Sequence, residues 1–365
     1  MDVFLLSSRP PLQLPLHSQP SLSPYLHAAT PVASAAAAAA AARRLVPRAA
    51  PPPLLARVSR RRATMSAAAS PGASPDTGRE VAGAVGQNDL LIVGPGVLGR
   101  IVADMWKQEY PGCKVFGQTA TTEHHNELTE IGIIPSLKGS ITGPKFPYVI
   151  FCAPPYRSED YPGDLSKDMC RMAVSNWNEE GSFLFTSSTA VYDCDDNGLC
   201  TEDCTCVPIG RSPRTDVLLK AENVVLEAGV YFVTVQWTEM IQYLLDLPHK
   251  SDRGPHVYWL SKGTVDARPD HILNLIHYED AASLAIAIMQ KRLRGRVFVG
   301  CDNEPLSRQE IMDRVNLSGK FDTKFHGFTG TDGPLGKRME NSKTRAEIGW
   351  QPKYPTFMEF LGLSN

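Results

Sequence analysis

The run at residues 90–99, LLIVGPGVLG, constrains the fold more than any other stretch of the chain. Its first four residues are apolar and predict a buried parallel strand, and Gly94, Gly96 and Gly99 follow in G-x-G-x-x-G spacing. Residues 101–106 then continue at helical period. In such a unit the first glycine permits a tight turn, the second lets backbone approach a pyrophosphate, and the third lets helix and strand pack closely. We therefore predict a dinucleotide-binding turn, for which an ordinary glycine turn is the alternative.

The first 65 residues have the composition of a targeting segment. They contain eight arginines, no lysine, a single acid, Asp2, and an unbroken alanine run at 35–42. An Arg-rich, Ser-rich and acid-poor opening is typical of an organelle transit peptide. We expect import into the plastid, and a mitochondrion is the second choice. Residues 1–65 are expected to be a disordered transit peptide, and residues 66–88 a linker that follows it. A disordered tail, or a translation start at Met65, is the alternative.

Charge separates the mature chain from nucleic-acid binders. Eight of the 37 basic side chains and one of the 39 acidic ones lie before residue 66, which leaves 29 against 38, a net charge of −9. Binding to nucleic acid needs lysine and arginine to replace counterions, so nucleic acid is not an expected partner. No stretch reaches the roughly 18 apolar residues of a membrane span. A small-molecule substrate is expected instead.

Short apolar strands alternate with helices along the rest of the chain. The expected strands are 114–117, 148–152, 182–186, 274–277 and 297–300, and the expected helices are 165–177, 217–228 and 281–289. This alternation is typical of an α/β fold with a Rossmann-type, doubly wound parallel sheet. We expect residues 89–300 to form the dinucleotide-binding domain and residues 301–365 a small C-terminal substrate lobe.

Four of the eight cysteines cluster: Cys194, Cys200, Cys204 and Cys206, among acidic residues. Their spacing, C-x5-C-x3-C-x-C, matches no common zinc site. An acidic loop with free thiols and no metal is the favoured interpretation, and a zinc site or a redox-sensitive pair remain alternatives.

Four segments together resemble the extended short-chain dehydrogenase/reductase superfamily, also called the NAD-dependent epimerase/dehydratase family. They are GPGVLG from Gly94, SSTAVY from Ser187, NLIHYEDAA from Asn274 and GKRMENSKTRAEIGWQPKYPTFMEFL from Gly336. The last segment, with CAPP from Cys152, resembles the YeeZ-like branch and its plastid relatives. The likeness covers residues 90–363.

The resemblance implies both cofactor-binding and catalytic residues. In the family, a Ser or Thr hydrogen-bonds the substrate and lies four residues before the tyrosine of an xVYG motif. In this sequence the two residues are Ser188 and Tyr192. A helix cap or a satisfied strand end is the alternative role for Ser187 and Ser188. The cofactor would contact Gly94, Gly96, Val97, Leu98, Gly99, Thr119, Cys152, Ala153 and Pro154.

The family's Tyr-x3-Lys pair has no counterpart. Alignment on Glu222 puts Arg214 at the tyrosine position and Leu218 at the lysine position. In the family the tyrosine transfers the proton, while the lysine lowers the pKa of that tyrosine and holds the ribose. We therefore expect little or no conventional turnover. A further departure is 236–250, which does not match the family pattern and leaves the substrate pocket there undefined, whether as an insertion, a divergent isoform or a faulty gene model.

The choice of cofactor depends on the end of the second strand. An acid about 20 residues beyond the first glycine would bind the ribose 2′-hydroxyl and favour NAD. Residues 118–122 read QTATT instead, with His124 and His125 nearby. Hydroxyl groups beside histidine tolerate a 2′-phosphate, so NADP is expected and NAD is the alternative, although the usual arginine is missing.

Two further groups have both a structural and a functional interpretation. Asp280 is expected to cap the helix that begins at Ala281. Lys337, Arg338 and Lys343 could contact an anionic substrate or form a solvated charged surface.

The sequence thus predicts an NAD(P)-dependent oxidoreductase or epimerase-like enzyme acting on a small or nucleotide-linked substrate. The alternative is a catalytically inactive dinucleotide-binding sensor or scaffold in the plastid.

Overall fold

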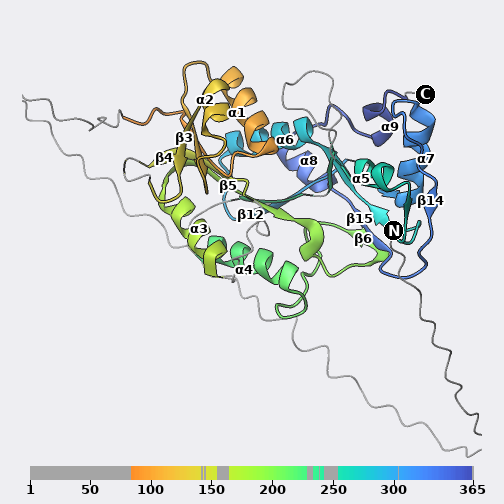
Figure 1. Ribbon diagram of the computed structural model, residues 1–365. Coiled ribbons are helices and arrows are strands. Elements are labelled where there is room, and N and C mark those ends of the chain that lie inside the picture. The colour runs from red at the N-terminus through yellow and green to blue at the C-terminus, as the bar shows by residue number, and fades with distance from the viewer. Residues whose placement is uncertain are drawn as a thin grey trace, which may run out of the picture. The chain divides into compact units, whose positions relative to one another are not determined.

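The largest sheet in the described part of the chain is parallel and has seven strands (Figure 1). The computed structural model describes residues 84–140, 143, 145–153, 164–227, 233–237, 239–241, 254–302 and 304–363. The strand order is β12-β7-β5-β4-β1-β2-β3, and every pairing is parallel. The chain runs outward from β1 in one direction through β2 and β3, and then returns to β4 on the other side. The carboxyl ends of β1 and β4 therefore form the switch point, where ligands bind in open α/β sheets.

The strands of this sheet have the following bounds: β1 Leu90–Val93, β2 Val115–Thr119, β3 Ile133–Leu137, β4 Phe146–Phe151, β5 Trp177–Ser188, β7 Val233–Trp237 and β12 Arg296–Gly300. The helices associated with it are α1 Val97–Glu109, α2 His125–Glu130, α3 Asp164–Ser175, α4 Pro213–Glu227, α6 Tyr278–Lys291 and α8 Ser342–Ile348.

Helices cover both faces of the sheet. Figure 1 shows α1 and α6 on one face and α3 and α4 on the other. Leu98, Val102 and Trp106 are four residues apart on α1, and this periodicity places all three in the core beneath that helix. Ala221 and Val225 of α4 have the same spacing and join the core on the opposite face. The predicted doubly wound α/β fold is present.

The end of one predicted helix and the start of the strand after it need correction, and two strands of this sheet, β3 and β7, were missed. Residue Trp177 belongs to β5 and not to the preceding helix, which ends at Ser175. Of the two missed strands, β3 contains Pro135 and lies at the sheet edge. An edge strand tolerates proline and half-exposed side chains, so the apolar run that marks a central strand is weak here.

A second lobe contains a four-stranded sheet and two small parallel pairs. The sheet has the order β13 (Leu306–Ser307), β10 (Ile272–Leu273), β15 (Gly336–Met339) and β6 (Asp196–Cys200). The pairs are β11 (Leu275–His277) with β8 (Glu239–Ile241), and β14 (Gly327–Phe328) with β9 (Thr264–Val265). The helices are α5 Pro255–Lys262, α7 Arg308–Ser318 and α9 Phe357–Phe360. Because β6 and β10 come from within residues 89–300, the lobe is assembled from several parts of the chain.

Residues 1–83 lie outside the described part of the chain, so the transit peptide and most of the linker remain predictions. Within the described part, no helix is both long enough and apolar enough to cross a bilayer.

Candidate functional site

The three glycines after β1 each occupy a different environment. Gly94 has φ +77°, and a Cβ there would lie 2.6 Å from the Ala153 Cα. A Cβ on Gly99 would lie 2.9 Å from the Cγ2 of Ile92, so this glycine lets α1 pack closely on β1. At Gly96, a Cβ would meet nothing within 4 Å. Only the second glycine therefore borders open space, which is what a pyrophosphate approaching the backbone requires.

The N-terminus of α1 is directed toward the same space. Its N-cap is Gly96, which makes no side-chain capping bond, and no acidic residue lies in the first turn. The first backbone N–H groups of a helix lack intrahelical acceptors and carry partial positive charge. Val97 and Leu98 therefore contribute amides to the cradle, while the Leu98 side chain is buried in the core. A phosphate-bearing cofactor fits this arrangement.

The end of β4 forms the adjoining wall. The amide of Cys152 donates to the Val93 carbonyl at 2.8 Å, and Ala153 closely approaches Gly94 as described above. Burial raises the pKa of the Cys152 thiol to about 12, so this thiol stays protonated and unreactive at neutral pH. Pro154 lies outside the described residues.

The end of β2 carries hydroxyl and imidazole groups at the position expected to contact the adenosine ribose. The hydroxyl of Thr119 lies 2.7 Å from Nε2 of His125 and donates to the Thr121 carbonyl at 2.8 Å. Close by in the fold, the Arg100 guanidinium pairs with Glu127 of α2 at 2.9 Å and lies 3.4 Å from the Pro95 carbonyl in the glycine turn. Arg100 was not predicted as a site residue, because its partner Glu127 lies 27 positions away in the sequence. The signal that could have found it is that a basic residue directly follows the third glycine.

The two serines at the end of β5 have different partners. The hydroxyl of Ser187 donates to Oε1 of Glu222 on α4, and both side chains are buried. The hydroxyl of Ser188 accepts from the Ala190 amide at 3.2 Å and caps the 3-10 helix η2, Thr189–Val191. The capping alternative therefore applies to Ser188, which still lies at the ligand-binding edge of the sheet.

Tyr192, four residues later, is turned toward the second lobe. Its side chain is 3% exposed, and its hydroxyl donates to the Glu202 carbonyl at 3.4 Å. Burial, and then the neighbouring thiols and carboxylates, raise the pKa of this phenol. In this conformation Tyr192 is a poor proton donor or acceptor at neutral pH.

Lys337 of β15, in the second lobe, stabilises the turn formed by residues 189–192 after β5. Its ammonium donates to the carbonyls of Thr189 at 3.0 Å and of Tyr192 at 2.6 Å. A register irregularity between Gly336 and Arg338 gives Lys337 its position in the strand. Lys343 instead pairs with Asp203 at 2.7 Å. Of the three cations considered for an anionic substrate, only Lys337 adjoins the β5 edge, and protein carbonyls already engage it.

The two α4 residues at the positions of the family's Tyr-x3-Lys pair lie in different surroundings. Leu218 is 5% exposed and packs with Val191 and Leu219, whereas Arg214 is exposed. Neither position therefore presents the phenol and ammonium pair of the family.

The segment that departs from the family pattern begins inside the sheet. In β7, Gln236 pairs in register with Ser187, and Trp237 pairs with Ser188. The backbone of this strand thus occupies the place beside β5 despite its unusual sequence, and residues 242–250 lie outside the described part.

The expected role of Asp280 is wrong in detail. The N-cap of α6 is His277, whose Nδ1 accepts from the Glu279 amide at 3.2 Å. The buried Asp280 carboxylate instead accepts from the amides of Lys353 at 2.6 Å and Tyr354 at 2.9 Å. It therefore attaches the C-terminal segment to α6, because a buried carboxylate needs hydrogen-bond donors and these two amides supply them.

All eight cysteines are free thiols. Within the described ranges, no group of three or more His, Cys, Asp or Glu side chains has the arrangement of a metal site.

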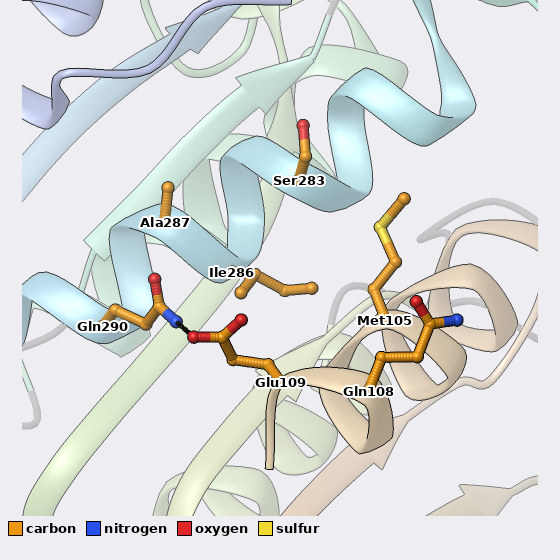
Figure 2. Close-up of a pocket in the computed structure, with 7 residues that line it drawn as sticks. All are labelled: Met105, Gln108, Glu109, Ser283, Ile286, Ala287 and Gln290. Carbon is orange, nitrogen blue, oxygen red and sulfur yellow. Dashed lines mark hydrogen bonds between the residues drawn. The ribbon is translucent and has the colours of Figure 1, made fainter. Parts of the chain in front are cut away.

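An open hollow lies elsewhere, between α1 and α6. Figure 2 shows its lining, including Met105 and Glu109 from α1 and Ile286 and Gln290 from α6. Gln290 donates to Glu109 at 3.0 Å across the hollow. Because it lies along the C-terminal half of α1, it is separate from the glycine cradle at the other end of that helix.

Comparison with family models and with curated proteins finds no match. Solved structures do match. UDP-glucose 4-epimerase from Thermotoga maritima, solved with UDP-glucose, is 13% identical with a TM-score of 0.59, covering 75% of this chain and 96% of that one. dTDP-glucose 4,6-dehydratase from Bacillus anthracis, solved with NAD, is 15% identical with a TM-score of 0.57, covering 75% and 94%. A functionally unknown conserved protein from Silicibacter pomeroyi is 18% identical with a TM-score of 0.58, covering 75% and 97%. The chain has the fold of these epimerases and dehydratases. The Rossmann-type doubly wound fold predicted from the sequence is confirmed.

Proposed function

We propose that the chain binds a nicotinamide dinucleotide and belongs to the NAD-dependent epimerase/dehydratase superfamily, in its YeeZ-like plastid branch. The observation that carries this proposal is the open space over Gly96, at the switch point and beside an uncapped helix N-terminus. Proteins of the same fold from Bacillus anthracis and Bacillus cereus have been solved with NAD, which supports it. When bound, the dinucleotide supplies the hydride acceptor or donor.

Each part of the cofactor has proposed contacts. The amides of Val97 and Leu98 would bind the pyrophosphate, and Thr119 at the end of β2 would face the adenosine ribose. Cys152 and Ala153 would border the cofactor on the β4 side. Ser188 would lie on the substrate side, where its hydroxyl can donate a hydrogen bond.

NADP is the proposed cofactor, with NAD as the alternative. At the end of β2, Thr119 stands where a carboxylate would select the 2′-hydroxyl and repel a 2′-phosphate. Arg100 and His125 supply groups that favour a phosphate at this corner. The nearest acid in that network, Glu127, is held by Arg100, which keeps the pKa of its carboxyl below the usual range.

The proposed reaction is an oxidoreductase or epimerase-like step on a small or nucleotide-linked substrate, without the Tyr-x3-Lys dyad. The Thermotoga maritima epimerase of the same fold was solved with UDP-glucose, which makes a sugar nucleotide the first substrate class to test. General acid–base assistance is typically worth about 10²–10⁴-fold in rate. Turnover should therefore be slow, with Ser188 supplying the hydrogen bond that remains.

A second candidate is a dinucleotide-binding sensor or scaffold with no turnover. It is favoured by the environment of Tyr192, whose hydroxyl is bonded to the Glu202 carbonyl and whose pKa is raised by burial. For either function we propose action in the plastid stroma after removal of the N-terminal segment. A fusion of residues 1–70 to a fluorescent reporter should enter plastids, and fluorescence that stays in the cytosol would contradict this.

Titration calorimetry on the mature protein tests the cofactor. NADPH should bind the wild type, and Gly96→Val should lose most of this affinity because its side chain fills the cradle. The φ of −76° at Gly96 suits any residue, so the variant should fold and melt like the wild type. Equal affinity in both proteins, or no binding to the wild type, would contradict the proposal.

Nicotinamide absorbance with UDP-glucose and related sugar nucleotides then separates the two candidates. Slow turnover that Ser188→Ala removes supports the enzyme, whereas binding without turnover supports the sensor. Robust turnover that survives both Ser188→Ala and Tyr192→Phe would place the active site elsewhere.

A further inference from the structure

Cys200 and Cys204 lie close together at the end of β6, where Cys204 packs against the buried cluster that contains Cys200. The sulfur of Cys204 accepts from the Thr201 amide at 3.3 Å and lies 4.0 Å from the Leu199 carbonyl. These two groups flank Cys200 on either side along the chain, so the Cys204 sulfur lies directly beside it. A turn closed by the Cys204 amide and the Thr201 carbonyl, at 3.1 Å, holds them together.

The other two cysteines also pack against the buried cluster that contains Cys200, but their further contacts lie elsewhere. The thiol of Cys194 donates toward Asp196 and Gly198, at 3.6 Å in each case. Cys206 packs against Val191 and the apolar residues of α4. Cys204 is distinguished from them because its sulfur contacts the residues on both sides of Cys200.

We propose that Cys200 and Cys204 are a dithiol site that a small-molecule disulfide oxidises to an intramolecular disulfide. The two sulfurs differ in access: Cys200 is fully buried, whereas Cys204 is partly exposed. Cys204 is the attacking group and Cys200 the resolving one. Burial, then the hydrogen bond with Cys204, raises the pKa of Cys200 to about 12, which agrees with this division of roles.

The exchange balances in two steps. The Cys204 thiol gives its proton to water, and its sulfur attacks one sulfur of the oxidant, which breaks the S–S bond and expels one thiolate. Cys200 then gives up its proton, and its sulfur attacks the Cys204 sulfur and expels the second thiolate. The protein loses two protons and two electrons overall, and the oxidant takes them up to become two thiols.

The bond would close a short loop around Glu202, which connects two parts of the candidate site. The main-chain carbonyl of Glu202 accepts from the Tyr192 hydroxyl, and its carboxylate accepts from the Thr344 amide at 3.2 Å. Oxidation would therefore restrain the contact between the turn after β5 and α8. This site is independent of whether the chain binds a dinucleotide.

The test is disulfide mapping on the folded, full-length mature protein. Because the loop carries several aspartates, the probe is uncharged hydroxyethyl disulfide, which the acidic surface does not repel. Remaining thiols are alkylated and the protein is cleaved before aspartate. Asp196 and Asp203 lie between the cysteines, so cleavage places Cys194, Cys200 and Cys204 on three separate peptides.

Oxidised wild type should yield the peptides of Cys200 and Cys204 joined, and Cys206→Ser should yield the same product. Cys204→Ser should leave Cys200 as a free thiol that is alkylated after unfolding. The proposal is overturned if Cys200 remains a thiol in oxidised wild type, if Cys194 is its partner, or if Cys206→Ser abolishes the link. The wild-type and Cys206→Ser maps decide the matter even if Cys204→Ser does not fold.

Discussion

The carboxyl ends of β1 and β5 are separated only by β4 in one sheet, yet they follow the family pattern to different degrees. At β1, the environments of Gly94, Gly96 and Gly99 match a turn, an open cradle and a close helix contact. At β5 the serines are present, but α4 presents an exposed Arg214 and a buried Leu218. Dinucleotide binding depends mainly on backbone shape, which a few glycines specify. Proton transfer depends on particular side chains, which can change while the fold persists.

Substitutions at the first two glycines of the turn should differ strongly in their effect on stability. Gly94→Ala should destabilise the protein by about 3–5 kcal/mol, because φ is positive and the new Cβ would collide with the Ala153 backbone. Gly96→Ala should change the free energy of unfolding by less than about 1 kcal/mol, since its Cβ enters open space. Urea denaturation of both variants measures this difference. Similar stability losses would show that the second glycine is structural too.

Acid should weaken the second lobe, which supports the β5 end. His256 is buried among Phe321, Phe357 and Phe360, and neither ring nitrogen has a hydrogen-bond partner in the described part of the chain. Burial lowers its pKa from 6.5 to about 4. The unfolded chain therefore binds the proton first, and the contribution of this group is present above pH 6.5 and lost as pH falls toward 4.

Across that window the loss from His256 should reach about 2–3 kcal/mol. His256→Leu should retain more stability at pH 4.5 relative to pH 7 than the wild type does, in denaturation measured at both values. Parallel pH dependence in the two proteins would mean that this imidazole is solvated or hydrogen-bonded.

Lys337→Met tests whether the turn after β5 depends on the second lobe. Losing the ammonium bonds to the Thr189 and Tyr192 carbonyls should cost about 2 kcal/mol. Hydrogen exchange should accelerate at 189–192 and stay unchanged in β1. Arg338→Met, at the exposed neighbouring position, is the matched control and should alter neither quantity. Equal exchange in both variants would remove Lys337 as a support of this turn.

The smallest effect concerns cofactor choice at the β1 side. Arg100→Ala should weaken NADPH binding about tenfold, or about 1.4 kcal/mol, and leave NADH binding nearly unchanged. Gln108→Ala, exposed on the same helix, is the control. Calorimetry with both cofactors gives the ratio. An equal loss for NADH and NADPH would assign Arg100 to the shape of the turn rather than to the 2′-phosphate.

Local patterns predicted the glycine turn and five of the seven strands of the main sheet, whereas β7, between β5 and β12, and β3 were missed. The β1 bounds agree residue for residue, because a short apolar run bounded by glycine has few other conformations. The edge strand β3 escaped prediction because Pro135 and half-exposed neighbours hide its pattern. The helix cap at Asp280 was wrong because Lys353 and Tyr354, which bind its carboxylate, are more than 70 positions away.

The βα unit, the alternation of strands and helices and the lack of an acid at the end of β2 can all be read from the amino-acid order, since each depends on neighbours within a few positions. Which side chains meet depends on the three-dimensional fold. It paired Arg100 with Glu127, Ser187 with Glu222 and Lys337 with the turn after β5. Such contacts join segments that the sheet topology brings together, and no local periodicity encodes them. The candidate cofactor cradle could thus be predicted from the sequence, whereas the surroundings of Ser188 could not.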